Sequence, residues 1–319
     1  MARLEKLPVD KISFDKIHVN RWFIVANPTS GNRNFSKKWK LIQQLLRDKN
    51  IHFSFSITQF VKHEIELVQN AVKQGYRNFI SVGGDGTLHH VVNAIMLQRY
   101  VKTSDITIAV IPLGTGNDWI KTHNIPNNIK KSIEIINQKK TILQDIGVLE
   151  TANQKLTYFN NVAGLGYDAY IVNKLKKLKS FGSLSYLLAG IYGLFFYKKS
   201  IFSISFDNQK IETTCLMTVI GLCKFSGGGM QFTKGVDTSD GFFDITIAKN
   251  ITFLDLVLNI NKLYSGKIVH HKKFETYKTK EICVQPKSDK TFVQADGELI
   301  GTGKVTAKIL EKAIKFVVN

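Results

Sequence analysis

The sequence predicts an α/β domain followed by a β-rich domain, and three observations lead to this fold class. Apolar, β-branched runs alternate with helical patterns over residues 22–145, which is typical of a parallel sheet covered by helices on both faces. After residue 145, short β-rich segments are separated by Gly, Asn, Asp or Ser turns, as in an antiparallel sandwich or barrel. A chain of 319 residues is also too long for one ordinary core. We therefore expect one domain over residues 1–147 and a second over residues 148–304.

The expected elements follow from the same periodicities. In the first domain we expect strands at 22–26, 53–58, 79–82 and 106–111, and helices at 36–49, 64–74, 88–98 and a short turn from 117. In the second we expect strands at 201–206, 215–223, 243–248, 281–285 and 292–295, and helices at 169–180, 184–197 and 252–265.

A glycine-rich loop, Gly-Gly-Asp-Gly-Thr at 83–87, directly follows the strand expected at 79–82. Open α/β sheets bind phosphorylated ligands at the carboxyl ends of their strands, and glycines let backbone N–H groups approach an anion. Thr87 is placed to cap the following helix, whose N-terminus favours negative charge. Asp85 suits a phosphate site only if a cation lies between the two, so the loop indicates a nucleotide with Mg²⁺. The alternative is a tight glycine turn with a capping threonine.

Three other strand ends carry small or acidic residues: NPTSG at 27–31, PLGTGND at 112–118 and ADGE at 295–298. Phosphoryl transfer requires a phosphate cradle, a metal and a group that orients or deprotonates the acceptor. The sequence contains no Gly-x4-Gly-Lys-[Ser/Thr] loop, so the cradle must come from these loops. Four such junctions in this order are not coincidence.

The acidic residues in these loops are candidates for the chemistry. We expect Asp85 and Asp118 to organise a metal ion and its water, although Asp118 could instead be a helix N-cap. On an extended strand, Asp296 and Glu298 would point to one face, where one carboxylate could accept the proton of a hydroxyl. The alternative is that Asp-Gly-Glu forms an ordinary hairpin turn.

The net charge of +19 indicates an anionic partner surface. Residues 169–206 contain no Asp or Glu, and lysines flank the apolar segment 184–197. This pattern favours an interfacial membrane contact, or alternatively a core helix with solvated lysines at its ends. The apolar run 186–197 is too short to span a bilayer, and the basic stretch 267–280 could be a solvated face. Three cysteines without metal spacing fit a reducing cytoplasm.

From Trp22 to the C-terminus, the chain resembles the soluble bacterial diacylglycerol kinase family, which shares its catalytic domain with sphingosine and ceramide kinases. Besides the four loops, the matching motifs are FNNVAGLGYDA at 159–169, GGGMQF at 227–232 and TSDGFFD at 238–244. GGDGT alone would also fit NAD kinases and phosphofructokinases, but GTGND with a late DGE favours the lipid kinases. The resemblance implies a phosphofructokinase- or NAD-kinase-like sheet and a β-sandwich, with the active site in the cleft between them and strand 305–319 returning to the first domain.

The resemblance implies an ATP- and Mg²⁺-dependent kinase that phosphorylates a membrane lipid, diacylglycerol to phosphatidic acid being the first expectation. Such an enzyme would be cytoplasmic and would bind peripherally to the anionic inner membrane face. The acceptor could instead be a sphingoid base, another lipid alcohol or NAD. From a different class, the chain could be a non-catalytic protein that binds anionic lipid. We expect no nucleic-acid partner, and a homodimer remains open.

The resemblance also implies roles for individual residues. Asp296 and Glu298 correspond to the catalytic base region, and Asp237, Asp240 and Phe242 to a structural Mg²⁺ site. The residues expected at ATP are Asn27, Pro28, Thr29, Ser30, Gly31, Thr58, Gly83, Gly84, Asp85, Gly86, Thr87, Gly114, Thr115, Asn117 and Asp118.

The chain departs from the family pattern directly after the phosphate-binding loop. His89 and His90 stand where Asn and Glu are usual, and Ala94 replaces a usual Gly. The loop itself is intact, so these changes bear on the acceptor or the rate rather than on ATP. A zinc site at the histidines is not expected, because no Cys or carboxylate lies at ligand spacing. Residues 164–169 formally match a dinucleotide fingerprint, but no acid follows at about 20 positions, so a strand-to-helix junction is the better interpretation.

Overall fold

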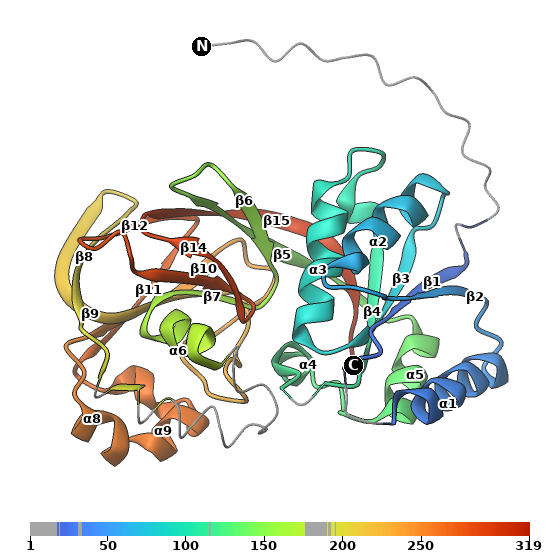
Figure 1. Ribbon diagram of the computed structural model, residues 1–319, viewed down its shortest axis with the longest axis horizontal. Helices are drawn as coiled ribbons and strands as arrows, with labels where there is room; N and C mark the ends of the chain where they lie inside the picture. The colour runs from blue at the N-terminus through green and yellow to red at the C-terminus, as the bar shows by residue number, and fades with distance from the viewer. Residues whose placement is uncertain are drawn as a thin grey trace, which may run out of the picture.

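The computed structural model describes residues 18, 20–30, 34–114, 116–175, 190, 193–194 and 196–319. Two lobes lie side by side, an α/β lobe and a β-rich lobe, and the long strand β15 runs from one to the other (Figure 1). The fold class expected from the sequence is confirmed. Among the described helices, none is long and apolar enough to cross a membrane. The expected helix 184–197, the end of the helix expected at 169–180, Gly31 and Thr115 lie wholly or largely outside the described residues.

The α/β lobe is built on a parallel sheet in the order β2-β1-β3-β4. β1 and the last five residues of β3 and β4 are buried, as expected for parallel strands covered by helices on both faces. Helices α2 and α3 cover one face, and α1 and α5 lie on the other (Figure 1). The strands are β1 (Trp22–Ala26), β2 (Phe53–Ile57), β3 (Asn78–Gly83) and β4 (Thr107–Pro112), and the helices are α1 (Phe35–Asp48), α2 (His63–Lys73), α3 (Asp85–Leu97), η2 (Thr103–Asp105), α4 (Asp118–Thr122) and α5 (Ile129–Gln138).

Helix α3 begins three residues before the expected start, at Asp85, directly from the glycine loop. The carbonyl of Gly84 accepts hydrogen bonds from the N–H groups of Thr87 and Leu88, so the loop itself winds into the first turn. The expectation that Thr87 caps this helix is therefore wrong. Its hydroxyl lies inside the first turn and accepts a hydrogen bond from Asn27 Nδ2 at 3.1 Å.

The β-rich lobe is mainly antiparallel, as expected, and the basic stretch 267–280 is not simply a solvated face. Part of it forms strand β11, which pairs with β10. The strands are β5 (Thr141–Thr151), β6 (Leu156–Phe159), β7 (Val162–Gly166), β8 (Ser200–Phe206), β9 (Gln209–Gly221), β10 (Phe243–Lys249), β11 (Phe274–Thr279), β12 (Glu281–Pro286), β13 (Phe292–Ala295), β14 (Glu298–Thr302) and β15 (Val305–Val317). The helices are α6 (Tyr167–Leu175), α8 (Phe253–Leu258), α9 (Ile260–Ser265) and η3 (Lys267–His270).

The single helix expected over 252–265 is broken into α8 and α9 at Asn259. The Asn259 side chain donates to the carbonyl of Asp255 at 2.7 Å, and its own N–H bonds to Leu256. These bonds satisfy two carbonyl groups in the last turn of α8, so the backbone does not continue as one helix.

Strand β15 ties the lobes together. Its first part pairs antiparallel with β12, nearly its whole length pairs with β5, and Lys315 and Phe316 pair parallel with β4. A bulge in β15 is held by Asp145, whose carboxylate accepts hydrogen bonds from Lys312 N at 2.6 Å and Gly241 N at 2.7 Å. The loops of both lobes are therefore fixed relative to each other by one continuous sheet.

Candidate active site

A cleft of about 800 Å³ lies between the lobes and brings together loops that are distant in sequence. Of the residues predicted at ATP or at the catalytic base, those that line it are Asn27, Pro28, Thr29, Ser30, Thr58, Gly84, Asp85, Gly86, Thr87, Gly114, Asn117, Asp118, Asp296 and Glu298. Gly83 lies behind the loop, where a Cβ would stand 2.4 Å from Thr87 Oγ1. Close packing against Thr87 therefore leaves no room for a side chain at position 83.

Two glycine loops touch backbone to backbone at the floor of the cleft. A Cβ on Gly114 would lie 2.7 Å from Gly84 Cα and 2.8 Å from Asn117 Oδ1. Asn117 adopts a left-handed conformation with φ of 44° and donates to the carbonyl of Gly114 at 2.6 Å. The contact leaves the backbone of both loops open to the cleft, as a phosphate cradle requires.

Asn27 joins three elements of the α/β lobe. Its Nδ2 donates to Glu64 Oε1 on α2 at 3.2 Å and to Thr87 Oγ1 on α3 at 3.1 Å. Its Oδ1 accepts from both the N–H and the hydroxyl of Thr29. The loop after β1 is therefore held against the glycine-rich loop at 83–87.

Asp85 and Asp118 lie close together, and the carboxylate of each accepts hydrogen bonds from other groups of the protein. Asp85 accepts hydrogen bonds from the N–H groups of Asp118 at 2.8 Å and Trp119 at 3.3 Å, which holds the start of α4. Burial, followed by the charge of Asp118, raises the pKa of Asp85 to about 6. Asp118 accepts from Gly228 N of the β-rich lobe at 2.7 Å and from Lys121 Nζ at 2.7 Å.

The alternative that Asp118 is a helix N-cap is wrong. The N-cap of α4 is Asn117, and Asp118 instead bonds across the cleft to Gly228. Among the described residues no group of three or more His, Cys, Asp or Glu is arranged to hold a metal ion. Mg²⁺ often takes only one or two carboxylates together with phosphate oxygens and water. The raised pKa of Asp85 beside Asp118 fits a position where a cation would relieve repulsion between carboxylates.

Asp296 and Glu298 do not share one face of an extended strand, so that expectation is wrong. Asp296 and Gly297 form the two-residue turn of the β13–β14 hairpin, with φ of 49° and 80°. Asp-Gly favours such a turn because both central residues need positive φ. The two carboxylates are therefore directed to different places.

Asp296 is 8% exposed and held by several donors. It accepts hydrogen bonds from the backbone N–H groups of Asn160, Asn161 and Val162 at 3.1, 2.9 and 3.1 Å. His89 Nδ1 lies 3.0 Å from its Oδ2. Glu298 also lines the cleft but is only partly buried, and its Oε1 lies 3.6 Å from the position of a Cβ on Gly86.

The structure also places Asp168 in the cleft, which the sequence did not predict. Its carboxylate packs against Gly164, where a Cβ would lie 1.7 Å from Oδ2, so the strand-to-helix junction is real. Oδ2 accepts from Gln294 Nε2 at 3.0 Å, while Oδ1 has no hydrogen-bond partner among the described residues. Burial raises the pKa of Asp168 to about 6. The signal in the sequence was the motif at 159–169, in which Asp168 follows two glycines of an apolar strand.

The comparisons with known proteins agree with this geometry. A model of the diacylglycerol kinase catalytic domain matches residues 21–149, and a model of the YegS C-terminal NAD kinase beta sandwich-like domain matches residues 161–318. A Bacillus subtilis (strain 168) protein named "Putative lipid kinase YtlR" is 30% identical over 306 residues, which cover 89% of this chain and 95% of that protein. The chain belongs to the diacylglycerol kinase family. It is a kinase with an alcohol group as acceptor.

A more distant relative carries the same family name, and a solved structure has the same fold. A diacylglycerol kinase of Staphylococcus saprophyticus is 26% identical over 280 residues, covering 87% of this chain and 88% of that protein. The crystal structure of a diacylglycerol kinase from Bacillus anthracis str. Sterne matches the fold with a TM-score of 0.71 at 18% identity, covering 94% of this chain and 97% of that chain.

The cleft of this kinase continues from the glycine-rich loops into an apolar pocket of the β-rich lobe. The pocket lies among α6, α9 and the sheet strands β7 and β9. Its apolar lining residues are Val162, Ile171, Leu216, Met217, Val219, Met230, Phe232, Ile251, Leu256, Leu263 and Phe274.

The predicted structural Mg²⁺ ligands lie away from this cleft, in the loop before β10. Asp237 Oδ1 accepts from the N–H and hydroxyl of Ser239, and Asp240 Oδ1 accepts from Phe242 N. The ammonium of Lys278 lies 2.5 Å from Asp240 Oδ2. As the side chains lie, Lys278 provides the positive charge beside Asp240. The metal assignment remains a prediction.

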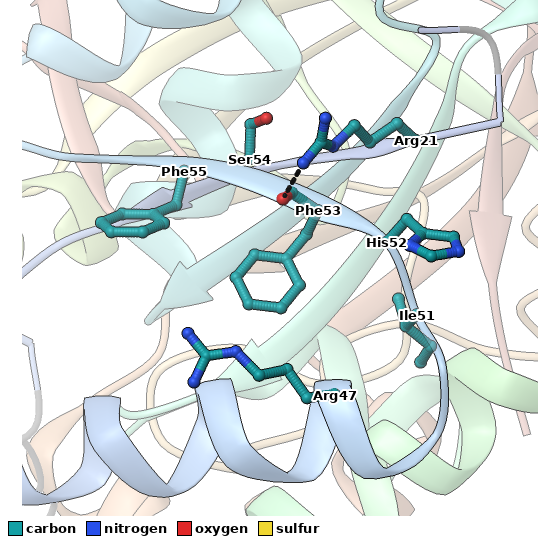
Figure 2. Close-up of a pocket in the computed structure, with 7 residues that line it drawn as sticks. All are labelled: Arg21, Arg47, Ile51, His52, Phe53, Ser54 and Phe55. Atoms are coloured by element: carbon teal, nitrogen blue, oxygen red, sulfur yellow. Dashed lines mark hydrogen bonds between the residues drawn. The ribbon is translucent and has the colours of Figure 1, made fainter.

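A second, open cavity of about 460 Å³ lies at the edge of the α/β lobe, between β2 and the end of α1 (Figure 2). Arg21 donates to the carbonyl of Phe53 at 3.2 Å, and Arg47 approaches from α1 (Figure 2). It shares no described lining residue with the cleft, and its described lining contains no glycine.

Proposed function

We propose that this kinase transfers the γ-phosphate of ATP to the hydroxyl of a membrane lipid, with diacylglycerol as the leading acceptor. One observation carries the proposal: a single cleft has glycine-rich loops at one end and an apolar pocket at the other. A soluble acceptor such as NAD has no need of an extended apolar wall. An acyl chain gains free energy from burial there, about 0.8 kcal/mol per buried CH₂ group.

The nucleotide phosphates bind at Gly84–Thr87, where the N-terminus of the 13-residue helix α3 favours negative charge. Thr58 and the loop from Asn27 to Ser30 form the adjoining wall. Mg²⁺, held through water by Asp85 and Asp118, would neutralise the charge that develops on the phosphates.

Glu298 is the general base in this proposal, and Asp296 is not. The lone pairs of Asp296 are directed at three backbone N–H groups and His89, which fixes the position of the carboxylate and leaves little capacity to accept a substrate proton. Glu298 lies in the open cleft beside Gly86, at the loop that would hold the phosphates. Its carboxylate can therefore accept the proton of a hydroxyl that attacks the γ-phosphate.

The acceptor enters from the membrane, so the kinase acts as a peripheral protein at the cytoplasmic membrane face. The net charge of +19 supports attraction to anionic lipid. Lipid alcohols in the bilayer surface then reach the apolar pocket without leaving the interface completely.

Asp168 favours a second acceptor class. Asp168 lines the cleft, and its buried Oδ1, which has no hydrogen-bond partner among the described residues, can accept one when the carboxyl is ionised. Diacylglycerol offers no donor besides the hydroxyl that reacts. A sphingoid base, which carries a second hydroxyl and an amine, would satisfy Asp168.

The test is a transfer assay with labelled ATP, Mg²⁺ and mixed micelles that contain, separately, diacylglycerol, sphingosine, ceramide or undecaprenol, with NAD in solution as a further arm. We expect label in the organic phase with diacylglycerol. Label with sphingosine alone would select the second class. Label only with NAD, or no transfer while ATP still binds, would overturn the lipid kinase proposal.

A further inference from the structure

His89 reaches from the α/β lobe into the β-rich lobe. It lies on α3, the helix that begins at the phosphate-binding loop, and its Nδ1 is 3.0 Å from Asp296 Oδ2. The two side chains are 6% and 2% exposed. The other hydrogen bonds to Asp296 from described residues come from the segment 160–162 of the β-rich lobe. His89 is thus the contact through which α3 holds this carboxylate.

The surroundings of His89 decide where its proton lies. Asn93, one turn further along α3, has its Nδ2 3.4 Å from His89 Nε2. The Asn93 amide is oriented by Tyr158, whose N–H donates to Oδ1 at 2.9 Å and whose carbonyl accepts from Nδ2 at 2.8 Å. The two hydrogens of this NH₂ group go to the carbonyls of Tyr158 and of His89 itself, both at 2.8 Å, so the amide mainly fixes the helix turn that carries the ring. An ionised carboxylate only accepts hydrogen bonds, so the nitrogen beside Asp296, Nδ1, carries the proton that is donated to it.

The turn that contains Asp296 is also fixed from the other side. Gly297 N donates to Gln294 Oε1 at 2.8 Å, and Gln294 Nε2 donates to Asp168. Glu298 follows directly and pairs with Ala295 across the hairpin. Only Gly297 separates Asp296 from Glu298 in this two-residue turn. A shift of Asp296 would therefore also move Glu298 at the start of β14.

We propose that His89 is a positioning residue that locks the Asp296–Gly297 turn to α3 and thereby keeps Glu298 over the phosphate-binding loop. The inference rests on Glu298 as the base of the proposed function. What it requires at position 89 is a donor where Nδ1 lies, not an imidazole ring. In asparagine, Nδ2 is bonded to Cγ just as Nδ1 is in histidine, so an amide places its donor at the same distance from the backbone.

The experiment compares His89→Leu, which removes the donor, with His89→Asn, which retains it. Val92→Ala, a buried residue on the same helix, is the matched control for a loss of packing. The measurements are kcat, the KM for ATP and for the acceptor found above, and Tm. We expect His89→Leu to lower kcat at least 10-fold with the KM for ATP changed less than 2-fold. His89→Asn and Val92→Ala should keep kcat within 3-fold of the wild type.

A double variant separates this inference from the base assignment. If His89 acts through Glu298, His89→Leu has no further effect on the residual rate of Glu298→Gln. An additive loss in the double variant would overturn the positioning role, and so would a His89→Asn enzyme as slow as His89→Leu. Full activity of Glu298→Gln alone would instead refute Glu298 as the base, whatever the histidine variants do.

Discussion

The carboxylate of Glu298 faces the backbone of Gly86 across the cleft, with Oε1 3.6 Å from the position of a Cβ on that glycine. Gly86 lies at the start of α3 in the α/β lobe, and Glu298 begins β14 in the β-rich lobe, so the two residues meet only in the folded tertiary structure. The contact places an acid beside the loop proposed to hold the phosphates.

Replacing Glu298 by Gln should abolish turnover without loss of nucleotide binding. A positioned general base contributes about 10²- to 10⁴-fold to a rate, so we expect kcat to fall by about that factor. ATP affinity, measured by calorimetry, should stay within a few-fold of the wild type, because Glu298 lies beside the phosphate loop and does not form it. A variant with undiminished kcat would exclude Glu298 as the base.

Asp296→Asn is the companion variant, and its defect should have a different origin. An amide nitrogen at one of the carboxylate positions would face N–H donors, so the variant should unfold at a lower temperature. Turnover lost with an unchanged Tm would argue that Asp296 reacts directly and does not act by holding the turn.

Gly114→Ala should destroy the contact between the two glycine loops. The new Cβ would lie 2.7 Å from Gly84 Cα, and backbone cannot move aside as a flexible side chain can. We expect a loss of about 1–3 kcal/mol of stability and little rise in Tm on addition of ATP and Mg²⁺. Gly190→Ala is the control, since the described structure has no atom within 4 Å of the Cβ it would add. An ATP-induced Tm rise as large as that of the wild type in Gly114→Ala would contradict the prediction.

Asp85 should make the kinase less stable as the pH rises through about 6. Burial and the charge of Asp118 raise the pKa of Asp85 from 3.8 to about 6, so the folded state binds the proton more tightly than the unfolded state. The stabilisation is complete below about pH 4 and is lost above about pH 6. Relative to wild type, Asp85→Asn should therefore gain up to about 3 kcal/mol between pH 4 and 7, as measured by urea unfolding. A constant difference across that range would contradict the assignment.

His123 should make the kinase less stable as the pH falls, which is the opposite of the effect of Asp85. Burial of the ring against Trp119 lowers its pKa from 6.5 to about 4, although the hydrogen bond to Gln144 Oε1 opposes this shift. The unfolded state therefore binds the proton first, and stability falls as the pH drops from about 6.5 toward 4, by up to about 3 kcal/mol. His123→Gln should remove this part of the acid destabilisation, and unfolding curves at pH 7 and 4.5 would measure it. An unchanged pH dependence in the variant would refute the assignment.

Most of the α/β lobe could be predicted because its signals are local. The bounds expected for the strand Trp22–Ala26 are exact. Those of Phe53–Ile57 differ by one residue at one end, and those of Asn78–Gly83 and Thr107–Pro112 by one residue at each end. Buried parallel strands read as continuous apolar runs, and loop glycines mark their ends. The long start of β9 at Gln209 was missed because its first residues are polar and exposed on an antiparallel strand.

The sequence by itself determined the family, the fold class and the set of loops that carry the chemistry, because strand periodicity and glycine-rich turns depend on neighbouring residues. It could not decide which carboxylates are free to react. Asp296 and Glu298 are two positions apart, yet the positive φ of the Asp-Gly turn buries one beside His89 and leaves the other in the cleft. Asp85 and Asp118 received hydrogen bonds from backbone groups that no spacing rule indicates. These outcomes depend on contacts between segments far apart in the chain, and only the packed tertiary structure brings those segments together.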